Sequence, residues 1–265
     1  MTVLNQAAVV LGSSRYVRRT VNALLKFNIT ISSRLRLNPI VEIPLSPLGV
    51  DARISINLLN RDPTNILEIF ANHIYDKYCR LRDGDVVVDC GAYIGEFTIQ
   101  ASKIVGPSGL ILAFEPNPRS FNLCKSNLER NGISNVMLFQ HALSDQEKDM
   151  RFKPDTSNFG GSKVVSPTEL ESTITVSART LSQYFTFLGG RTIKLLKIDA
   201  EGSASNIVLG SDSLLRKKLV QYVSAEIHPG EEGLQTLLEN YGFKCSRENS
   251  YLYGTSQDHQ HPSPN

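Results

Sequence analysis

The chain has 265 residues, of which 41% are hydrophobic and 20% are charged. These proportions are close to those of globular proteins, so they exclude a chain that is disordered as a whole and predict one main domain with a buried core. The formal net charge of +2 is too small for strong nonspecific binding to nucleic acid, which depends on many clustered lysines and arginines.

The first 48 residues differ in composition from the rest, and we treat them as a basic N-terminal arm. Residues 1–41 contain no Asp or Glu but carry six Arg and Lys side chains. Ser14 is placed to cap a helix whose apolar positions Val17, Val21, Leu24 and Leu25 follow helical spacing. Two interpretations stay open. The helix packs on the domain or on a second subunit of a homo-oligomer, or it contacts a membrane surface as a basic amphipathic helix.

The arm lacks the features of a secretory signal. The apolar run at residues 7–11 has no preceding positive charge, and no run in the chain reaches transmembrane length. We therefore expect the protein in the cytoplasm. The four cysteines are scattered and form no CxxC pair, so we expect reduced, buried thiols and neither a zinc site nor a thiol redox motif.

The main domain is predicted to span residues 49–254. Residues 51–59 alternate like a strand, and residues 62–78 have the spacing of a helix. The inward side chains of that helix are expected to be Ile66, Ile69, Phe70, Ile74 and Tyr78. From residue 85 onward strand and helix patterns alternate, which implies right-handed crossovers and a parallel sheet. The expected strands are 86–89, 110–115, 136–139, 193–199 and 221–227, and the expected helices include 96–104 and 119–131.

Residues 142–180 depart from this alternation. Two short strand-like pieces, at 149–152 and 173–177, flank a loop at 158–162 in place of a helix, and this insertion could shape a substrate pocket. Residues 242–246 and 250–253 indicate a closing antiparallel pair. A disordered tail is expected over residues 255–265, so His259 and His261 are not expected to bind a metal.

The strongest local motif is the Gly-rich turn that follows the strand at residues 86–89. Gly91 and Gly95 lack the Cβ that would keep a ligand away from the backbone, and the start of the next helix offers free N–H groups to a carboxylate. The carboxylate of S-adenosylmethionine suits that place. A dinucleotide fold uses a related device, but its three-glycine fingerprint is incomplete here, so a nicotinamide-dependent oxidoreductase is the less favoured alternative.

Polar side chains follow the next strands at the same edge of the predicted sheet. Glu115 ends the second strand, where a carboxylate can accept the hydrogens of both ribose hydroxyls of an adenosine. His141 and Ala142 leave the third strand, where they would line the adenine edge, although His141 could equally be a surface histidine. Asp199 and Glu201 follow the fourth strand, above the expected place of the donor methyl, where they could orient the donor or take up a proton.

The fifth strand ends with Glu226 and His228, which point to one face by strand periodicity. His228 is our first candidate for a general base, because the unperturbed pKa of histidine lies near physiological pH. A structural histidine bonded to the sheet edge is the alternative. The acids Asp199, Glu201 and Glu226 could hold a divalent ion, but we predict no bound metal.

Five blocks of the sequence resemble, in order and spacing, the FkbM-type S-adenosylmethionine-dependent methyltransferase family. The resemblance covers residues 50–254 and implies a class I methyltransferase (Rossmann-like) α/β fold, doubly wound, with a mostly parallel seven-stranded sheet and a short N-terminal helical and strand extension. It also implies S-adenosylmethionine as donor and commonly O-methylation of a hydroxyl on a sugar, glycolipid or natural-product acceptor. The blocks are Asp89-Cys-Gly-Ala-Tyr-Ile-Gly95, Phe114-Glu-Pro-Asn-Pro118, Asn158-Phe-Gly-Gly161, Lys197-Ile-Asp-Ala-Glu-Gly202 and Glu226-Ile-His228.

The resemblance, together with the strand-end positions, yields a set of predicted site residues. The catalytic residues are expected to be His228, Asp199 and Glu201. The predicted donor-binding residues are Asp89, Gly91, Ala92, Gly95, Glu115, Pro116, Asn117, His141, Ala142 and Asp199.

One position departs from the family's pattern, which usually continues the Asp-x-Glu-Gly block with another residue and a second Glu. This chain has Ser203 and Ala204 there, which leaves open any role of the missing carboxylate. A binding protein that kept the fold and lost catalysis is therefore one alternative. An RNA methyltransferase is another, supported only by the basic arm and opposed by the nearly neutral remainder of the chain.

Overall fold

The computed structural model describes residues 40–57, 62–153, 163–164 and 173–259. The helix predicted within the basic arm and the loop predicted at residues 158–162 lie outside the described residues. No helix in the described ranges is both long and apolar enough to cross a membrane.

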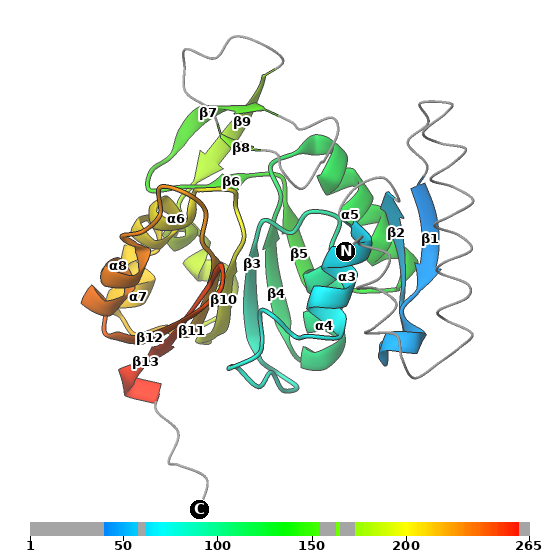
Figure 1. Ribbon diagram of the computed structural model, residues 1–265, viewed down its shortest axis with the longest axis horizontal. Helices are drawn as coiled ribbons and strands as arrows, with labels where there is room; N and C mark the ends of the chain where they lie inside the picture. The colour runs from blue at the N-terminus through cyan, green and yellow to red at the C-terminus, as the bar shows by residue number, and fades with distance from the viewer. Residues whose placement is uncertain (1–39, 58–61, 154–162, 165–172, 260–265) are drawn as a thin grey trace, which may run out of the picture.

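A seven-stranded sheet forms the centre of the molecule, in the order β12-β13-β11-β10-β3-β4-β5 (Figure 1). Neighbouring strands run parallel except β13, which is antiparallel to both β11 and β12. The predicted mostly parallel seven-stranded sheet is thus confirmed, including the closing antiparallel pair. The strands are β3 (Val86–Cys90), β4 (Leu110–Phe114), β5 (Val136–Phe139), β10 (Ile193–Ile198), β11 (Val220–Glu226), β12 (Phe243–Glu248) and β13 (Tyr251–Ser256).

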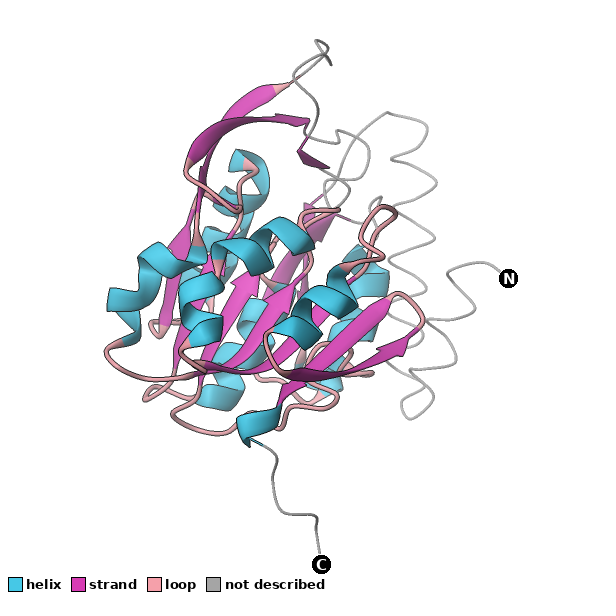
Figure 2. Ribbon diagram, turned by 90° about the vertical axis from the view of Figure 1, so that its left-hand side faces the viewer, coloured by secondary structure: helices cyan, strands magenta, loops and turns pink. Residues whose placement is uncertain are grey.

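Helices cover both faces of this sheet, as Figure 2 also shows. Alternate residues of β3 divide between two apolar cores: Val86 and Val88 belong to one, and Val87 belongs to the other. Strands buried on both faces are continuous apolar runs rather than alternating ones, which explains their clear sequence pattern. The second core is covered by α3 (Asp62–Phe70), α4 (Glu96–Val105) and α5 (Pro118–Arg130), and the first by η3 (Leu181–Leu188), α6 (Ala204–Gly210), α7 (Asp212–Arg216) and α8 (Leu234–Asn240).

A two-stranded hairpin lies against α5. Its strands β1 (Ile40–Pro44) and β2 (Arg53–Asn57) are antiparallel and flank a short 3-10 helix, η1 (Ser46–Leu48). Asn127 on α5 accepts a hydrogen bond from the backbone N of Ser55 at 2.8 Å and donates to the carbonyl O of Ser55 at 3.2 Å. The hairpin therefore includes residues 40–48, which the sequence pattern assigns to the arm.

The helix predicted over residues 62–78 ends earlier, at Phe70. Gln100 donates to the carbonyl of Ile69 at 2.9 Å, which satisfies one of the acceptors left at the helix end, and His73 adopts a left-handed φ of 51°. The shift in direction buries Tyr75, which is 4% exposed, and leaves Tyr78 46% exposed. The prediction that Tyr78 faces inward is therefore wrong, and Tyr75 takes that place.

The insertion after β5 forms a separate four-stranded sheet in the order β6-β9-β7-β8. Its strands are β6 (Ala142–Leu143), β7 (Lys148–Lys153), β8 (Lys163–Val164) and β9 (Ile174–Arg179), and they lie near the carboxyl ends of the central strands (Figure 1). At the other end of the chain β13 and the short 3-10 helix η4 (Gln257–His259) extend past residue 254, the predicted end of the domain.

Candidate active site

A cavity of about 390 Å³ opens at the carboxyl ends of β3, β4, β10 and β11. The inserted sheet contributes Ala142, Leu143 and Phe152 to its wall, so the insertion shapes the cavity as expected. Nine of the predicted site residues line it: Gly91, Ala92, Glu115, Pro116, His141, Ala142, Asp199, Glu201 and His228. The other three, Asp89, Gly95 and Asn117, are not among the lining residues.

Asp89 is fully buried beneath the Gly-rich turn. Its Oδ1 lies 2.9 Å from Nζ of the buried Lys197, and its Oδ2 accepts from the Thr98 hydroxyl at 2.5 Å. Lys197 also donates to the carbonyl O of Gly91 at 2.7 Å. Burial lowers the pKa of Lys197, but the charges of Asp89 and Asp199 outweigh that effect and raise it to about 12, so the lysine stays protonated. Asp89 therefore positions the turn through Lys197 instead of facing the cavity.

The two turn glycines are needed for packing. Gly91 has a φ of 81°, and a Cβ placed on it would lie 1.8 Å from the carbonyl O of Asp199. At Gly95, with a φ of 95°, a Cβ would meet Sγ of Cys124 at 3.0 Å. The contact at Gly91 brings the turn and Asp199 to the same wall of the cavity, which Gly91 also lines. The close approach of a ligand to this turn stays a prediction. Asn117 caps α5, because its Oδ1 accepts from the backbone N of Arg119 at 3.0 Å.

Glu115 lines the cavity where β4 ends. Its Oε2 accepts from the backbone N of Tyr93 and its Oε1 from the backbone N of Asn117, both at 2.8 Å. Burial raises the pKa of Glu115 to about 7, although the two backbone donors oppose this shift. Each carboxylate oxygen keeps one lone pair for a further donor, so this group fits the hydroxyls of a ribose.

His141 lies at the entrance to the inserted sheet. Its Nδ1 is 2.5 Å from the hydroxyl of Tyr184, and its ring is stacked near Phe139 with a centroid distance of 6.4 Å. Burial, and then the charge of Arg179, lower its pKa, which favours a neutral ring at neutral pH. A flat neutral ring beside Ala142 suits the wall of an adenine site.

Asp199 follows β10 and accepts a hydrogen bond at Oδ2 from the Tyr75 hydroxyl at 2.7 Å. Burial raises the pKa of Asp199, but His228, Lys197 and the Tyr75 hydroxyl outweigh it and lower the pKa to about 2. Asp199 is therefore ionised at any physiological pH. The sequence pattern does not indicate Tyr75 as a site residue, because it belongs to the irregular segment that replaces the end of the predicted helix.

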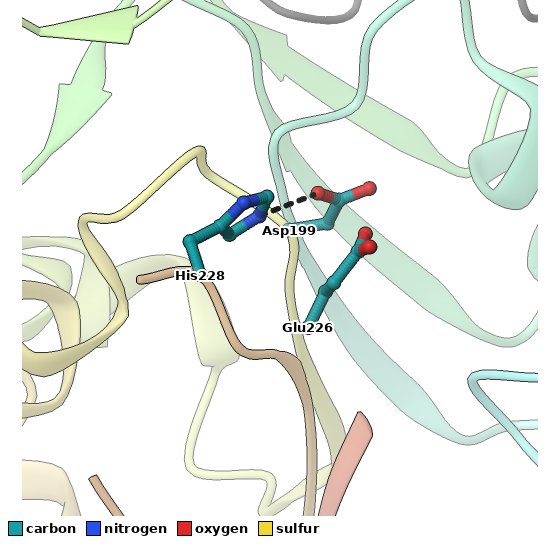
Figure 3. Close-up of side chains that lie close together, drawn as sticks. All are labelled: Asp199, Glu226 and His228. Atoms are coloured by element: carbon teal, nitrogen blue, oxygen red, sulfur yellow. Dashed lines mark ion pairs between the residues drawn. The ribbon is translucent and has the colours of Figure 1, made fainter. Parts of the chain in front are cut away.

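His228 lies between two carboxylates of the cavity wall. Its Nε2 is 3.9 Å from Oδ1 of Asp199, as drawn in Figure 3, and its Nδ1 is 3.5 Å from Oε2 of Glu201. The Asp199 carboxylate raises the pKa of His228 to about 9 against the opposing effect of burial, and Glu201 and Glu226 add to the increase. The free protein thus holds an imidazolium at neutral pH, contrary to the unperturbed pKa assumed from sequence. Nε2 is buried and makes no hydrogen bond to the described residues.

Glu226 completes this group from the end of β11. Burial, and then the charge of Asp199, raise its pKa to about 7. One ligand atom from each of Asp199, Glu226 and His228 lies within 4.8 Å of the other two, a spacing that a divalent ion could use (Figure 3). The absence of a bound metal stays a prediction.

A buried carboxylate that the sequence did not indicate connects two loops of the site. Glu231 is 4% exposed. Its Oε1 accepts from the backbone N of Ala204 at 2.5 Å, and its Oε2 accepts from the backbone N of His228 at 3.0 Å. Ala204, which stands where the family usually has a second Glu, begins α6, and its N–H is bound by Glu231. Glu231 also holds the loop that carries His228.

The strand order, the cavity at the carboxyl edge and a carboxylate at the end of the second central strand define a class I S-adenosylmethionine-dependent methyltransferase. Within that class, residues 89–245 match the model of the methyltransferase FkbM domain. This match covers more than half of the chain, so the chain belongs to the FkbM methyltransferase family.

Two curated relatives extend this similarity. The chain is 29% identical over 226 residues to the 31-O-demethyl-FK506 methyltransferase FkbM of Streptomyces tacrolimicus, covering 73% of this chain and 86% of the relative. It is 24% identical over 243 residues to the 2-O-methyltransferase NoeI of Sinorhizobium fredii, covering 83% and 88%. Among solved structures, the methyltransferase FkbM of Methylobacillus flagellatus KT matches with a TM-score of 0.49 and 16% identity over 66% of this chain and 44% of that one.

Proposed function

We propose that this methyltransferase transfers a methyl group to a hydroxyl oxygen of a sugar, glycolipid or natural-product acceptor. The supporting observation is His228, whose buried Nε2 has no hydrogen-bond partner among the described residues and lies on the wall that Asp199 and Glu201 share. The names of the two curated relatives, a 31-O-demethyl-FK506 methyltransferase and a 2-O-methyltransferase, agree with this choice of acceptor atom.

The donor would lie along the ends of β3 and β4. When bound, S-adenosylmethionine supplies a methyl group on a sulfonium sulfur that is already reactive. Glu115 would accept hydrogen bonds from the ribose hydroxyls, while Pro116, His141 and Ala142 would surround the adenine. The protein's main contribution is then to align the acceptor oxygen with the methyl carbon.

In the transfer the acceptor oxygen would form a bond to the methyl carbon of the bound donor, and the sulfur would keep the electron pair of the broken carbon–sulfur bond. The hydroxyl proton leaves toward His228, provided that the ring has first released its own proton. The positive charge of a bound sulfonium favours this release, because a nearby like charge lowers the pKa of an imidazolium. Asp199 and Glu201 keep the ring in place throughout.

Isothermal titration with S-adenosylmethionine, and separately with NAD, tests the donor. We expect binding of S-adenosylmethionine only, weakened on the order of tenfold or more in Glu115→Ala, because a buried carboxylate that accepts two hydroxyl hydrogens is lost. Glu42→Ala removes a carboxylate outside the cavity and serves as the control. Binding of NAD in place of S-adenosylmethionine would contradict the proposal.

A methyl-transfer assay over a panel of hydroxyl compounds then tests the acceptor. Transfer to an alcohol, lost in His228→Asn with donor binding intact, is the expected result. Tight donor binding without turnover on any hydroxyl compound would instead favour a protein that kept the fold and lost catalysis.

A further inference from the structure

A buried carboxyl group without a use in the mechanism above lies in the same cavity. Glu96 is the first residue of α4, lines the cavity and is only 2% exposed. Its Oε1 is buried and has no hydrogen-bond partner among the described residues. Most buried polar atoms in proteins have a partner, so an oxygen left without one at a cavity wall indicates that a ligand supplies it.

The neighbouring acid cannot supply that partner. Asp62, the first residue of α3, is 1% exposed. Its Oδ2 accepts from the backbone N of Asn57 at 2.6 Å and its Oδ1 accepts from the Tyr93 hydroxyl at 2.8 Å. Burial raises the pKa of Asp62 to about 6. Burial also raises the pKa of Glu96 well above its usual value, and the charge of Asp62 adds to that increase.

Lys197, a cation that also lines the cavity, is bound to other groups. Lys197 binds the carboxylate of Asp89 and the carbonyl O of Gly91, and its effect on Glu96 does not cancel the effect of burial. Among the residues that the structure describes, Glu96 and Asp62 therefore form a pair of buried acids to which no cation is bound. A ligand that carries an ammonium group would donate to Oε1 and offset the charge of the pair.

The amino-acid end of the donor carries a carboxylate and an ammonium group, and the cavity wall at the start of α4 can bind both. The start of α4, a helix of 10 residues, favours a carboxylate through its free N–H groups and its dipole. The unpartnered oxygen of Glu96 at the same place can accept a hydrogen bond, and an ammonium donor would also offset the charge of the two acids. An α-amino acid carries these two charges on one carbon, so one zwitterionic group can satisfy both.

We propose that Glu96 binds the α-ammonium group of S-adenosylmethionine, and so selects donors that keep an intact amino-acid end. This inference rests on the proposed donor. It assigns to Glu96 a role in binding rather than in methyl transfer, and it distinguishes Glu96 from Glu115, which faces the ribose.

The test compares two ligands that differ in the amino-acid end. S-adenosylhomocysteine carries that end without the sulfonium charge, whereas 5′-methylthioadenosine lacks it. Isothermal titration of the full chain should show that Glu96→Gln weakens S-adenosylhomocysteine binding on the order of tenfold to a hundredfold and leaves 5′-methylthioadenosine binding unchanged. Glu42→Gln, at a carboxylate outside the cavity, should change neither affinity.

Thermal unfolding of the same variants separates a binding role from a structural one. Without ligand, Glu96→Gln should melt at the wild-type temperature or higher, because it replaces a buried acid whose Oε1 has no hydrogen-bond partner among the described residues. An equal loss of affinity for both ligands, or no loss for either, would overturn the role of Glu96. If the wild-type protein binds neither ligand and does not bind S-adenosylmethionine, the proposed donor fails, which is a different outcome.

Discussion

His228 shows how far neighbouring charges can move a group from the behaviour expected of its residue type. With a pKa of about 9 in the free protein, the ring is protonated at pH 7 and cannot accept the proton of a hydroxyl. Asp199, which stays ionised, and Glu201 hold the charged ring in place. A base role for His228 therefore requires either a higher pH or the arrival of a second positive charge.

The pH dependence of turnover follows from this charge. The value of kcat/KM for the donor reports the free enzyme, so it should rise with pH, about tenfold per unit, until it levels off near pH 9. The value of kcat reports the donor-bound enzyme and should level off at lower pH, since the sulfonium lowers the pKa of the imidazolium. His228→Asn should lower turnover and flatten both profiles, whereas His141→Asn should keep their shape. Wild-type profiles that are flat between pH 6 and 9 would remove His228 as the base.

Stability should change with pH in the opposite direction. The folded-state pKa of His228 is raised from 6.5 to about 9, so its ion pairs stabilise the fold fully below pH 6.5 and cease to do so as the pH rises through 9. Part of this effect is reduced by solvent, because the ring is 21% exposed. The two measurements should therefore change in opposite directions: between pH 6.5 and 9, turnover should rise while the free energy of unfolding falls.

At the scale of elements, the sequence predicts best what depends on local pattern. The strands β3, β4 and β10 were placed to within one residue because both of their faces are buried and their apolar runs are continuous. Glu115 and Asp199 followed from those strand ends. Tyr75 and Glu231 could not be predicted, because each reaches the site through a contact far along the chain or through an irregular turn.

The turn after β3 illustrates the same limit. The sequence predicts that its glycines admit a ligand, and the structure shows a second requirement at Gly91, whose missing Cβ leaves room for the carbonyl O of Asp199. The sequence pattern indicates that small residues are needed at this turn, but it does not reveal the contact with the neighbouring strand. Experiment can separate the effect of the left-handed φ angle from the effect of the contact with Asp199, because Gly49 has a similar φ angle and makes no such contact.

Replacing Gly91 and Gly49 by Ala makes that separation. Both have a left-handed φ, 81° and 83°, but a Cβ on Gly49 meets nothing within 4 Å, whereas one on Gly91 lies 1.8 Å from the Asp199 carbonyl. Gly49→Ala should lower the free energy of unfolding by about 1 kcal/mol. Gly91→Ala should lower it by about 3 kcal/mol or more, because the strand end must move. Urea unfolding measures both, and equal losses would mean that the contact is not strained.

For the whole molecule, charge is distributed unevenly. The chain carries a formal net charge of +2, yet the cavity wall holds acids in excess over its cations, Lys197 and the protonated His228. The acids are Glu68, Glu96, Glu115, Asp199, Glu201 and Glu226. Several have raised pKa values, which reduces but does not reverse this excess. Such a wall suits a cationic donor and opposes an acceptor that brings negative charge close to it.

Acceptor preference should follow from this field. Between two hydroxyl acceptors that differ by one phosphate near the methylated oxygen, we expect the uncharged compound to have a kcat/KM on the order of tenfold higher or more. Each unit charge a few ångströms from a carboxylate costs at least about 1 kcal/mol, and a phosphate carries between about 1.5 and 2 charges. Added salt should narrow the difference only partly, because the wall is partly buried. Glu201→Gln should narrow the difference in kcat/KM further by removing one of the more exposed acids, with Glu42→Gln, outside the cavity, as the control.

An RNA acceptor, a polyanion, should give no transfer. If the phosphorylated compound or RNA proved to be the better substrate, cations outside the described residues would have to supply the missing positive charge, and the basic arm would then become the first region to truncate.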